Sequence, residues 1–105
     1  MTVIYVETAA NSREVQWLIQ SAIEAEVSRL KLALEAARTR LAIFENKYDV
    51  SSEQFISEMA AEDLEGKDDE YIQWAGEYHL MESMGERLKQ LQGVEFGDPN
   101  LLRAD

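Results

Sequence analysis

The side chains best able to do chemistry in this sequence are a single histidine and a run of carboxylates. His79 is the only histidine, and Glu82 follows it at a spacing that places both side chains on one face of a helix. Di-metal carboxylate sites in helix bundles use paired Glu-x-x-His motifs, and this motif does not occur in the chain. We therefore interpret His79 as a hydrogen-bonded or partly exposed side chain and expect no metal there.

Carboxylates also gather around Gly66, as they do in cation-binding loops. EF-hand loops place their ligands at alternating positions before a glycine and add a glutamate six residues after it. The residues around Gly66 do not keep this spacing, and the other four glycines are scattered rather than grouped into a phosphate-binding loop. The chain has no cysteine, which excludes thiol nucleophiles and thiolate metal sites. We therefore expect a non-enzymatic protein that uses no cofactor.

The net charge of −11 is concentrated in the second half of the chain. Residues 1–50 carry six basic and seven acidic residues, whereas residues 51–105 carry four basic and fourteen acidic ones. A surface of this charge repels nucleic-acid phosphates and anionic lipids and attracts basic proteins. We therefore expect no direct contact with nucleic acid or membrane. The lack of cysteine and of a long apolar run near the start favours a soluble cytoplasmic protein.

From Glu53 to Glu86 the chain holds eleven acidic residues and only one basic residue, Lys67. These carboxylates could imitate nucleic-acid phosphates toward a basic protein, pair with basic residues of the preceding segment, or face water. Exposed ion pairs contribute only about 0 to 1 kcal/mol each, so internal pairing does not explain the excess. The predicted partner-binding acidic face comprises Glu58, Glu62, Asp63, Glu65, Asp68, Asp69 and Glu70.

A helix over residues 12–46 is the element around which these groups must be arranged. Its apolar residues recur at steps of four and three without an intervening glycine or proline, which is the heptad pattern of a helix that packs along one seam. Asn11 and Glu14 suit its start as N-cap and capping-box residues. The seam residues are Ile23, Val27, Leu30, Leu34, Ala37, Leu41, Phe44 and Tyr48.

Two further helices complete a predicted domain of residues 11–93. Ser51 is suited to cap a short helix over residues 51–64, with Gln54 as its capping-box partner. A third helix over residues 69–92 carries a second seam, which predicts packing against the first helix. The seam residues are Tyr71, Trp74, Tyr78, Met81, Gly85 and Leu88, and we interpret the aromatic ones as core because a base-stacking platform needs a basic groove.

The resulting fold is predicted to be all-α, an antiparallel long-helix hairpin with a short linking helix and a short N-terminal β-arm. The arm occupies residues 1–10, because Thr2–Glu7 is rich in β-branched and aromatic residues. The sequence shows no second strand for it, so we expect the arm to lie on the helices or to pair with a second copy or a partner's sheet. We expect residues 94–105 to form a mobile tail.

The first predicted helix is longer than the third, which leaves one end of it without a partner. At 1.5 Å per residue the two helices span roughly 52 and 36 Å, a difference of about 15 Å. Large apolar residues on such an end favour association with another chain. We therefore expect a homodimer whose interface includes Val3, Tyr5, Val15, Trp17, Leu18 and Ile19.

Two segments within residues 41–92 form a packing signature rather than a catalytic one. They read Asn46-Lys47-Tyr48-x-x-Ser51-Ser52-Glu53-x-Phe55 and Asp69-Glu70-Tyr71-Ile72-x-Trp74-Ala75-Gly76. These two segments resemble those of the small acidic coiled-coil proteins of bacteria and archaea that serve as antitoxin-like partners in toxin–antitoxin cassettes. The resemblance implies a prokaryotic protein that masks a basic, toxin-like protein. The alternative function is that of a structural, scaffolding coiled-coil subunit that forms homo-oligomers.

Overall fold

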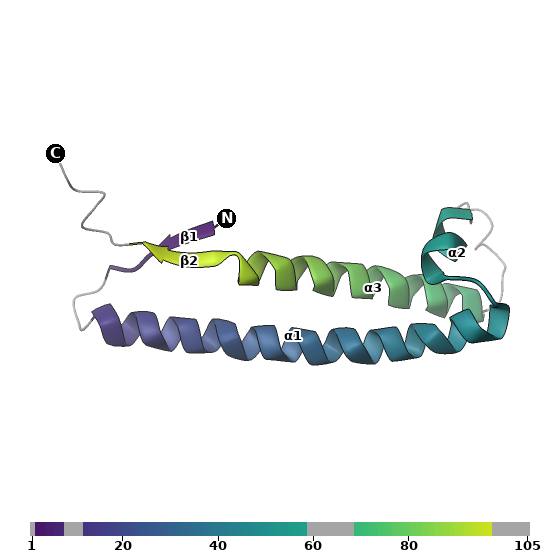
Figure 1. The fold of residues 1–105 in the computed structure, drawn as a ribbon, viewed down its shortest axis with the longest axis horizontal. Helices are drawn as coiled ribbons and strands as arrows, with labels where there is room; N and C mark the ends of the chain where they lie inside the picture. Colours follow the sequence, from purple (N-terminus) through teal and green to yellow (C-terminus); the bar gives the residue numbers. More distant parts are fainter. Residues whose placement is uncertain (1, 8–11, 59–68, 98–105) are drawn as a thin grey trace. The chain divides into compact units, whose positions relative to one another are not determined.

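The computed structural model describes residues 2–7, 12–58 and 69–97, and the expected helical fold is confirmed within them (Figure 1). Three helices, α1 (Ser12–Tyr48), α2 (Ser52–Glu58) and α3 (Asp69–Gln92), account for most of these residues. Two short strands, β1 (Thr2–Tyr5) and β2 (Val94–Gly97), stand near the two ends of the chain. The third helix has its predicted bounds, α1 ends two residues later than predicted, and the predicted end of the second helix lies outside the described residues.

The chain divides into two compact units, which we describe separately. The terminal unit consists of Met1–Lys31 and Glu86–Asp105, and the central unit consists of Leu32–Gly85. Each unit therefore contains part of α1 and part of α3. Within α1, the heptad seam is confirmed as the buried side of the helix at Leu30, Leu34, Ala37 and Leu41.

The end of α1 is fixed by a residue in the left-handed backbone region. Asp49 has a φ of 54°, and the Val50 N–H donates a hydrogen bond of 3.2 Å to the Glu45 carbonyl oxygen. This arrangement is typical of helix C-termini, where glycine is the usual residue because it has no Cβ atom to clash.

Replacing Asp49 with glycine is expected to raise the free energy of unfolding by about 0.5–1 kcal/mol, because glycine adopts this φ without steric cost. Urea denaturation followed by circular dichroism measures the change. The matched control is Asp69→Gly at the first residue of α3, which should not raise the free energy of unfolding. A less stable Asp49→Gly protein would contradict this account of the helix end.

The predicted N-cap of α2 is confirmed. The Gln54 N–H donates to Ser51 Oγ at 3.1 Å, as a capping serine requires. The reciprocal half of the predicted capping box is not seen, because Gln54 Nε2 donates instead to Glu58 Oε1 at 3.0 Å. The Ser52 N–H is bound by Glu45 Oε2 at 2.7 Å, so a carboxylate of α1 holds the start of α2.

An aromatic core organises the central unit around Trp74 of α3. Its ring is fully buried and stacks on Phe55 of α2 with a centroid distance of 3.8 Å and an interplanar angle of 2°. Tyr48 and Phe44 of α1 stack on the same indole at centroid distances of 5.5 and 5.6 Å. Trp74 Nε1 donates to buried Ser52 Oγ at 2.8 Å. The prediction that the aromatic seam is core is confirmed at Trp74.

The terminal unit contains a two-stranded parallel sheet, which corrects two expectations from the sequence. The predicted N-terminal strand is present, but it pairs with β2 of the same chain, with Thr2 opposite Val94 and Ile4 opposite Phe96. Residues 94–97 therefore do not belong to a mobile tail, whereas residues 98–105 lie outside the described residues. The short segment Val94–Gly97 follows Gly93 and itself ends in a glycine, and only a pairing partner distant in sequence makes it a strand.

Candidate protein-binding surface

A shallow apolar groove on the central unit is the best candidate for a binding surface. Arg40, Ile43 and Phe44 of α1 line one side. The other side comes from α3 and comprises Gln73, Gly76, Glu77 and Leu80. Ile43 is 64% exposed and Leu80 is 48% exposed, although both are large aliphatic side chains. The groove therefore presents apolar surface that the described part of the chain does not cover.

Gly76 leaves the groove open along α3. A Cβ atom built at this position meets nothing within 4 Å, and the residue does not adopt the left-handed backbone that favours glycine. A glycine inside a helix costs about 0.5–1 kcal/mol relative to alanine. Since the described part of the chain gives no packing reason for glycine here, Gly76 is suited to the close approach of another molecule.

An ion pair stands beside this groove. Arg40 Nε donates to Glu77 Oε1 at 2.7 Å, and this hydrogen bond raises the pKa of Arg40 above its ordinary value. The pair joins α1 to α3 within the central unit. Exposed pairs of this kind contribute little to stability. We therefore infer that the Arg40–Glu77 pair mainly holds the α1 and α3 sides of the groove in place.

A second polar cluster joins Lys47, Tyr48 and Glu70 at the start of α3. Lys47 Nζ donates to both Glu70 oxygens at 2.8 and 2.9 Å, and the Tyr48 hydroxyl donates to Glu70 Oε2 at 2.9 Å. The hydrogen bond from Lys47, followed by that from Tyr48, lowers the pKa of Glu70 below its ordinary value of 4.5. Partial burial, followed by the bond to Glu70, raises the pKa of Tyr48.

This cluster predicts a specific acid dependence of stability. Because the pKa of Glu70 is lower in the folded protein, its contribution is present above the ordinary value of 4.5 and is lost as the pH falls through the lower folded value. We expect Glu70→Gln to be less stable at neutral pH and to lose less of its remaining stability on acidification. Urea denaturation over a pH series measures both effects. Asp69→Asn is the matched control, and an identical acid response in the two variants would contradict the prediction.

The predicted acidic face is only partly available for a partner. Glu58 and Asp69 are exposed, whereas Glu70 is half-buried and bound to Lys47 and Tyr48. The role of these three residues in partner binding stays a prediction. The remaining four positions, Glu62, Asp63, Glu65 and Asp68, lie outside the described residues. The sequence of the central unit nevertheless carries 13 acidic and 4 basic residues.

The residues predicted to form an oligomer interface all belong to the terminal unit. The structure leaves four of them exposed and two half-buried. Val3, Tyr5, Trp17 and Leu18 are exposed, and Val15 and Ile19 are half-buried. Their partner is not seen, so their role in association stays a prediction.

His79 is an exposed residue whose Nδ1 lies 3.5 Å from Glu82 Oε1, which agrees with its interpretation as a partly exposed side chain. Within the described ranges no cluster of three His, Cys, Asp or Glu side chains could hold a metal ion. None of the described helices is both long enough and apolar enough to cross a membrane.

The groove is not predicted by the sequence alone. Ile43 and Leu80 stand directly before the seam residues Phe44 and Met81, and the groove forms only when two helices bring these positions together. The sequence does contain two indications of the groove. An aliphatic residue directly precedes a seam residue on each helix, and Gly76 lies four residues before Leu80 on the same helix face. Comparison with models of protein families, with curated proteins and with solved structures gives no match.

Proposed function

We propose that this chain is a non-enzymatic protein-interaction module whose central unit binds a basic protein, as an antitoxin-like protein binds and masks its toxin. The observation that carries the proposal is the groove at Gly76, flanked by exposed Ile43 and Leu80 on an acidic unit. The groove would take an apolar side chain of the partner, and the net negative charge of the central unit would attract its basic residues.

Burial of apolar surface would supply the affinity. Fully burying an aliphatic side chain contributes about 1.5–3 kcal/mol, and Ile43 and Leu80 each have roughly half or more of their surface to bury. Gly76 allows a partner to approach the backbone of α3 closely. Such a small apolar centre with charged surroundings is the usual anatomy of a protein interface.

Electrostatic attraction would select the partner and speed its approach. The central unit carries 13 acidic residues against 4 basic ones, and two of the basic residues, Arg40 and Lys47, are already paired with Glu77 and Glu70. A net charge of this sign raises the association rate with basic proteins and is screened by salt.

Two ion pairs support an antiparallel, coiled-coil-like arrangement of the helices in the central unit as the framework of this site. Lys47 pairs with Glu70, and Arg40 pairs with Glu77. The second pair lies seven residues earlier on α1 and seven residues later on α3, as expected when two helices run in opposite directions. The absence of cysteine supports a reducing location such as the prokaryotic cytoplasm.

Affinity capture from cells of the source organism tests the proposal. We expect the tagged full chain to retain a basic protein at about 0.1 M salt and to release it at about 1 M, where the screening length falls from about 10 to 3 Å. If the captured protein inhibits growth when produced alone, co-production of this chain should restore growth. Recovery of no basic protein, or retention that ignores salt, would contradict the proposal and favour a purely structural role.

A further inference from the structure

Within the residues that the structure describes, one edge of strand β1 has unpaired backbone groups. The Thr2 N–H donates to the Gly93 carbonyl oxygen at 3.0 Å, so Thr2 directs its backbone groups toward the other strand. Because this direction alternates along a strand, Val3 and Tyr5 direct their N–H and C=O groups away from β2. The sheet consists of two strands in the part of the chain that the structure describes. The edge of β1 is therefore a template for a further strand.

Nothing in the sequence of β1 protects this edge. Natural proteins protect exposed strands with lysine, proline, inward-pointing charges or bulges. The four residues of β1 are Thr-Val-Ile-Tyr, which include no charge and no proline. Val3 is 42% exposed and Tyr5 is 45% exposed, so the strand offers apolar side chains together with its unpaired backbone.

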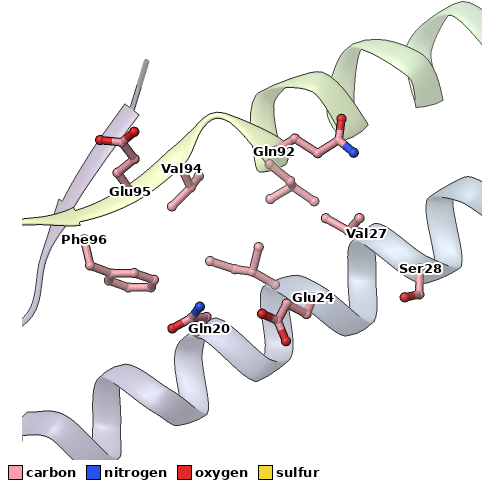
Figure 2. Close-up of a pocket in the computed structure, with 10 residues that line it drawn as sticks. Gln20, Glu24, Val27, Ser28, Gln92, Val94, Glu95 and Phe96 are labelled. Atoms are coloured by element: carbon pink, nitrogen blue, oxygen red, sulfur yellow. The ribbon is translucent and has the colours of Figure 1, made fainter.

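The terminal unit also has little core of its own. Among its described residues, Leu30 is the only buried apolar side chain. Figure 2 shows the Val94 and Phe96 side chains turned toward the stretch of α1 that carries Gln20 and Glu24, so α1 covers one face of the sheet. Val3 and Tyr5 lie on the opposite face of β1, because side chains alternate along a strand. Parallel sheets are normally covered on both faces, and two strands alone are marginally stable.

The low net charge of the terminal unit favours a second copy of the chain as the occupant of this edge. The sequence of the terminal unit carries eight acidic and six basic residues, whereas the central unit carries 13 and 4. Two terminal units can therefore approach each other with little repulsion. A basic protein is attracted to the central unit instead, so the two surfaces suit different partners.

We propose that β1 pairs with β1 of a second copy, antiparallel about a two-fold axis at Ile4, which joins two small sheets into one of four strands. A two-fold axis uses the same surface of both copies, and the same strand can meet itself across such an axis only in the antiparallel sense. In this register Val3 lies opposite Tyr5 of the partner subunit, and this pair of a β-branched and an aromatic residue occurs twice. The dimer does not depend on the function proposed for the central unit.

Cysteine cross-linking tests the strand register. The natural chain has no cysteine, so a single introduced thiol can form a disulfide only between chains. Opposite residues of a hydrogen-bonded antiparallel pair have Cα atoms about 5.5 Å apart, within the disulfide range of about 4.4–6.8 Å. We expect a mixture of Val3→Cys and Tyr5→Cys chains to form the mixed covalent dimer at least tenfold faster than either variant alone forms its own dimer. No advantage of the mixture would overturn the proposal.

Sedimentation equilibrium of the 105-residue chain tests whether the β1 edge forms the dimer. We expect the natural protein to be a dimer and Val3→Pro to be a monomer, because proline removes the outward N–H of residue 3 without changing the bonds toward β2. Val3→Thr, which keeps this N–H, is the matched control and should remain a dimer. Circular dichroism should show unchanged helix content in both variants. A monomeric natural protein, or a Val3→Pro protein that stays dimeric, would overturn the proposal.

Discussion

Replacing Trp74 with alanine is expected to lower the free energy of unfolding by about 3–5 kcal/mol. The indole is fully buried, stacks on Phe55, and contacts Phe44 and Tyr48 of α1. Its removal leaves a cavity where α1, α2 and α3 of the central unit meet. It also leaves buried Ser52 Oγ without the Trp74 Nε1 donor, and an unpaired buried polar group adds its own cost.

Two comparison variants separate these contributions in urea denaturation. Trp74→Phe keeps an aromatic ring against Phe55 but loses the hydrogen bond to Ser52, so its loss should be smaller than that of Trp74→Ala. Leu80→Ala is the control on the same helix, since Leu80 is exposed, and it should change stability by no more than about 0.5 kcal/mol. Equal losses for Trp74→Ala and Leu80→Ala would contradict the described core.

Replacing Leu30 with alanine is expected to lower the free energy of unfolding by about 2–5 kcal/mol. Leu30 is fully buried on α1 and lines one pocket of the terminal unit together with Thr2, Leu91 and Val94. Because it is the only buried apolar side chain described in that unit, little else can fill the space that its removal leaves.

The matched control for Leu30 is Leu32, two residues later on the same helix. Leu32 is 68% exposed, so Leu32→Ala should change stability by no more than about 0.5 kcal/mol. Amide hydrogen exchange should show faster exchange in β1 and β2 of Leu30→Ala, since both strands belong to the unit that loses its core. A loss of stability in Leu32→Ala equal to that in Leu30→Ala would show that the seam has been assigned to the wrong face of α1.

The sequence predicted the buried side of α1 because that information is local. The steps of four and three along α1 identified Leu34, Ala37 and Leu41 as seam residues, and all three are buried. Trp74 was predicted as core from the same kind of spacing on α3 and is buried. Ser51 was predicted as an N-cap from its position before an apolar run, and its side chain accepts the expected hydrogen bond.

The features that sequence reasoning missed depend on contacts between distant residues. Val94–Gly97 has only four residues, follows Gly93 and ends in Gly97, so it cannot be identified as a strand without its partner Thr2–Tyr5. The pairing of Glu70 with Lys47 could not be inferred from the acidic run, because it depends on how α3 meets α1 in the central unit. The groove at Gly76 likewise requires both helices.

The central claim is that the groove at Gly76 binds a basic partner. The most direct test compares the affinity for the captured partner between the Gly76→Gln and Gly85→Gln proteins. Both glycines stand on α3, and a Cβ atom at either position meets nothing within 4 Å. Each substitution should stabilise the helix by about 0.5–1 kcal/mol, but only residue 76 lines the groove with Ile43 and Leu80. The account predicts that Gly76→Gln weakens binding at least tenfold while Gly85→Gln binds like the natural protein. Equal affinity of the two variants would contradict it.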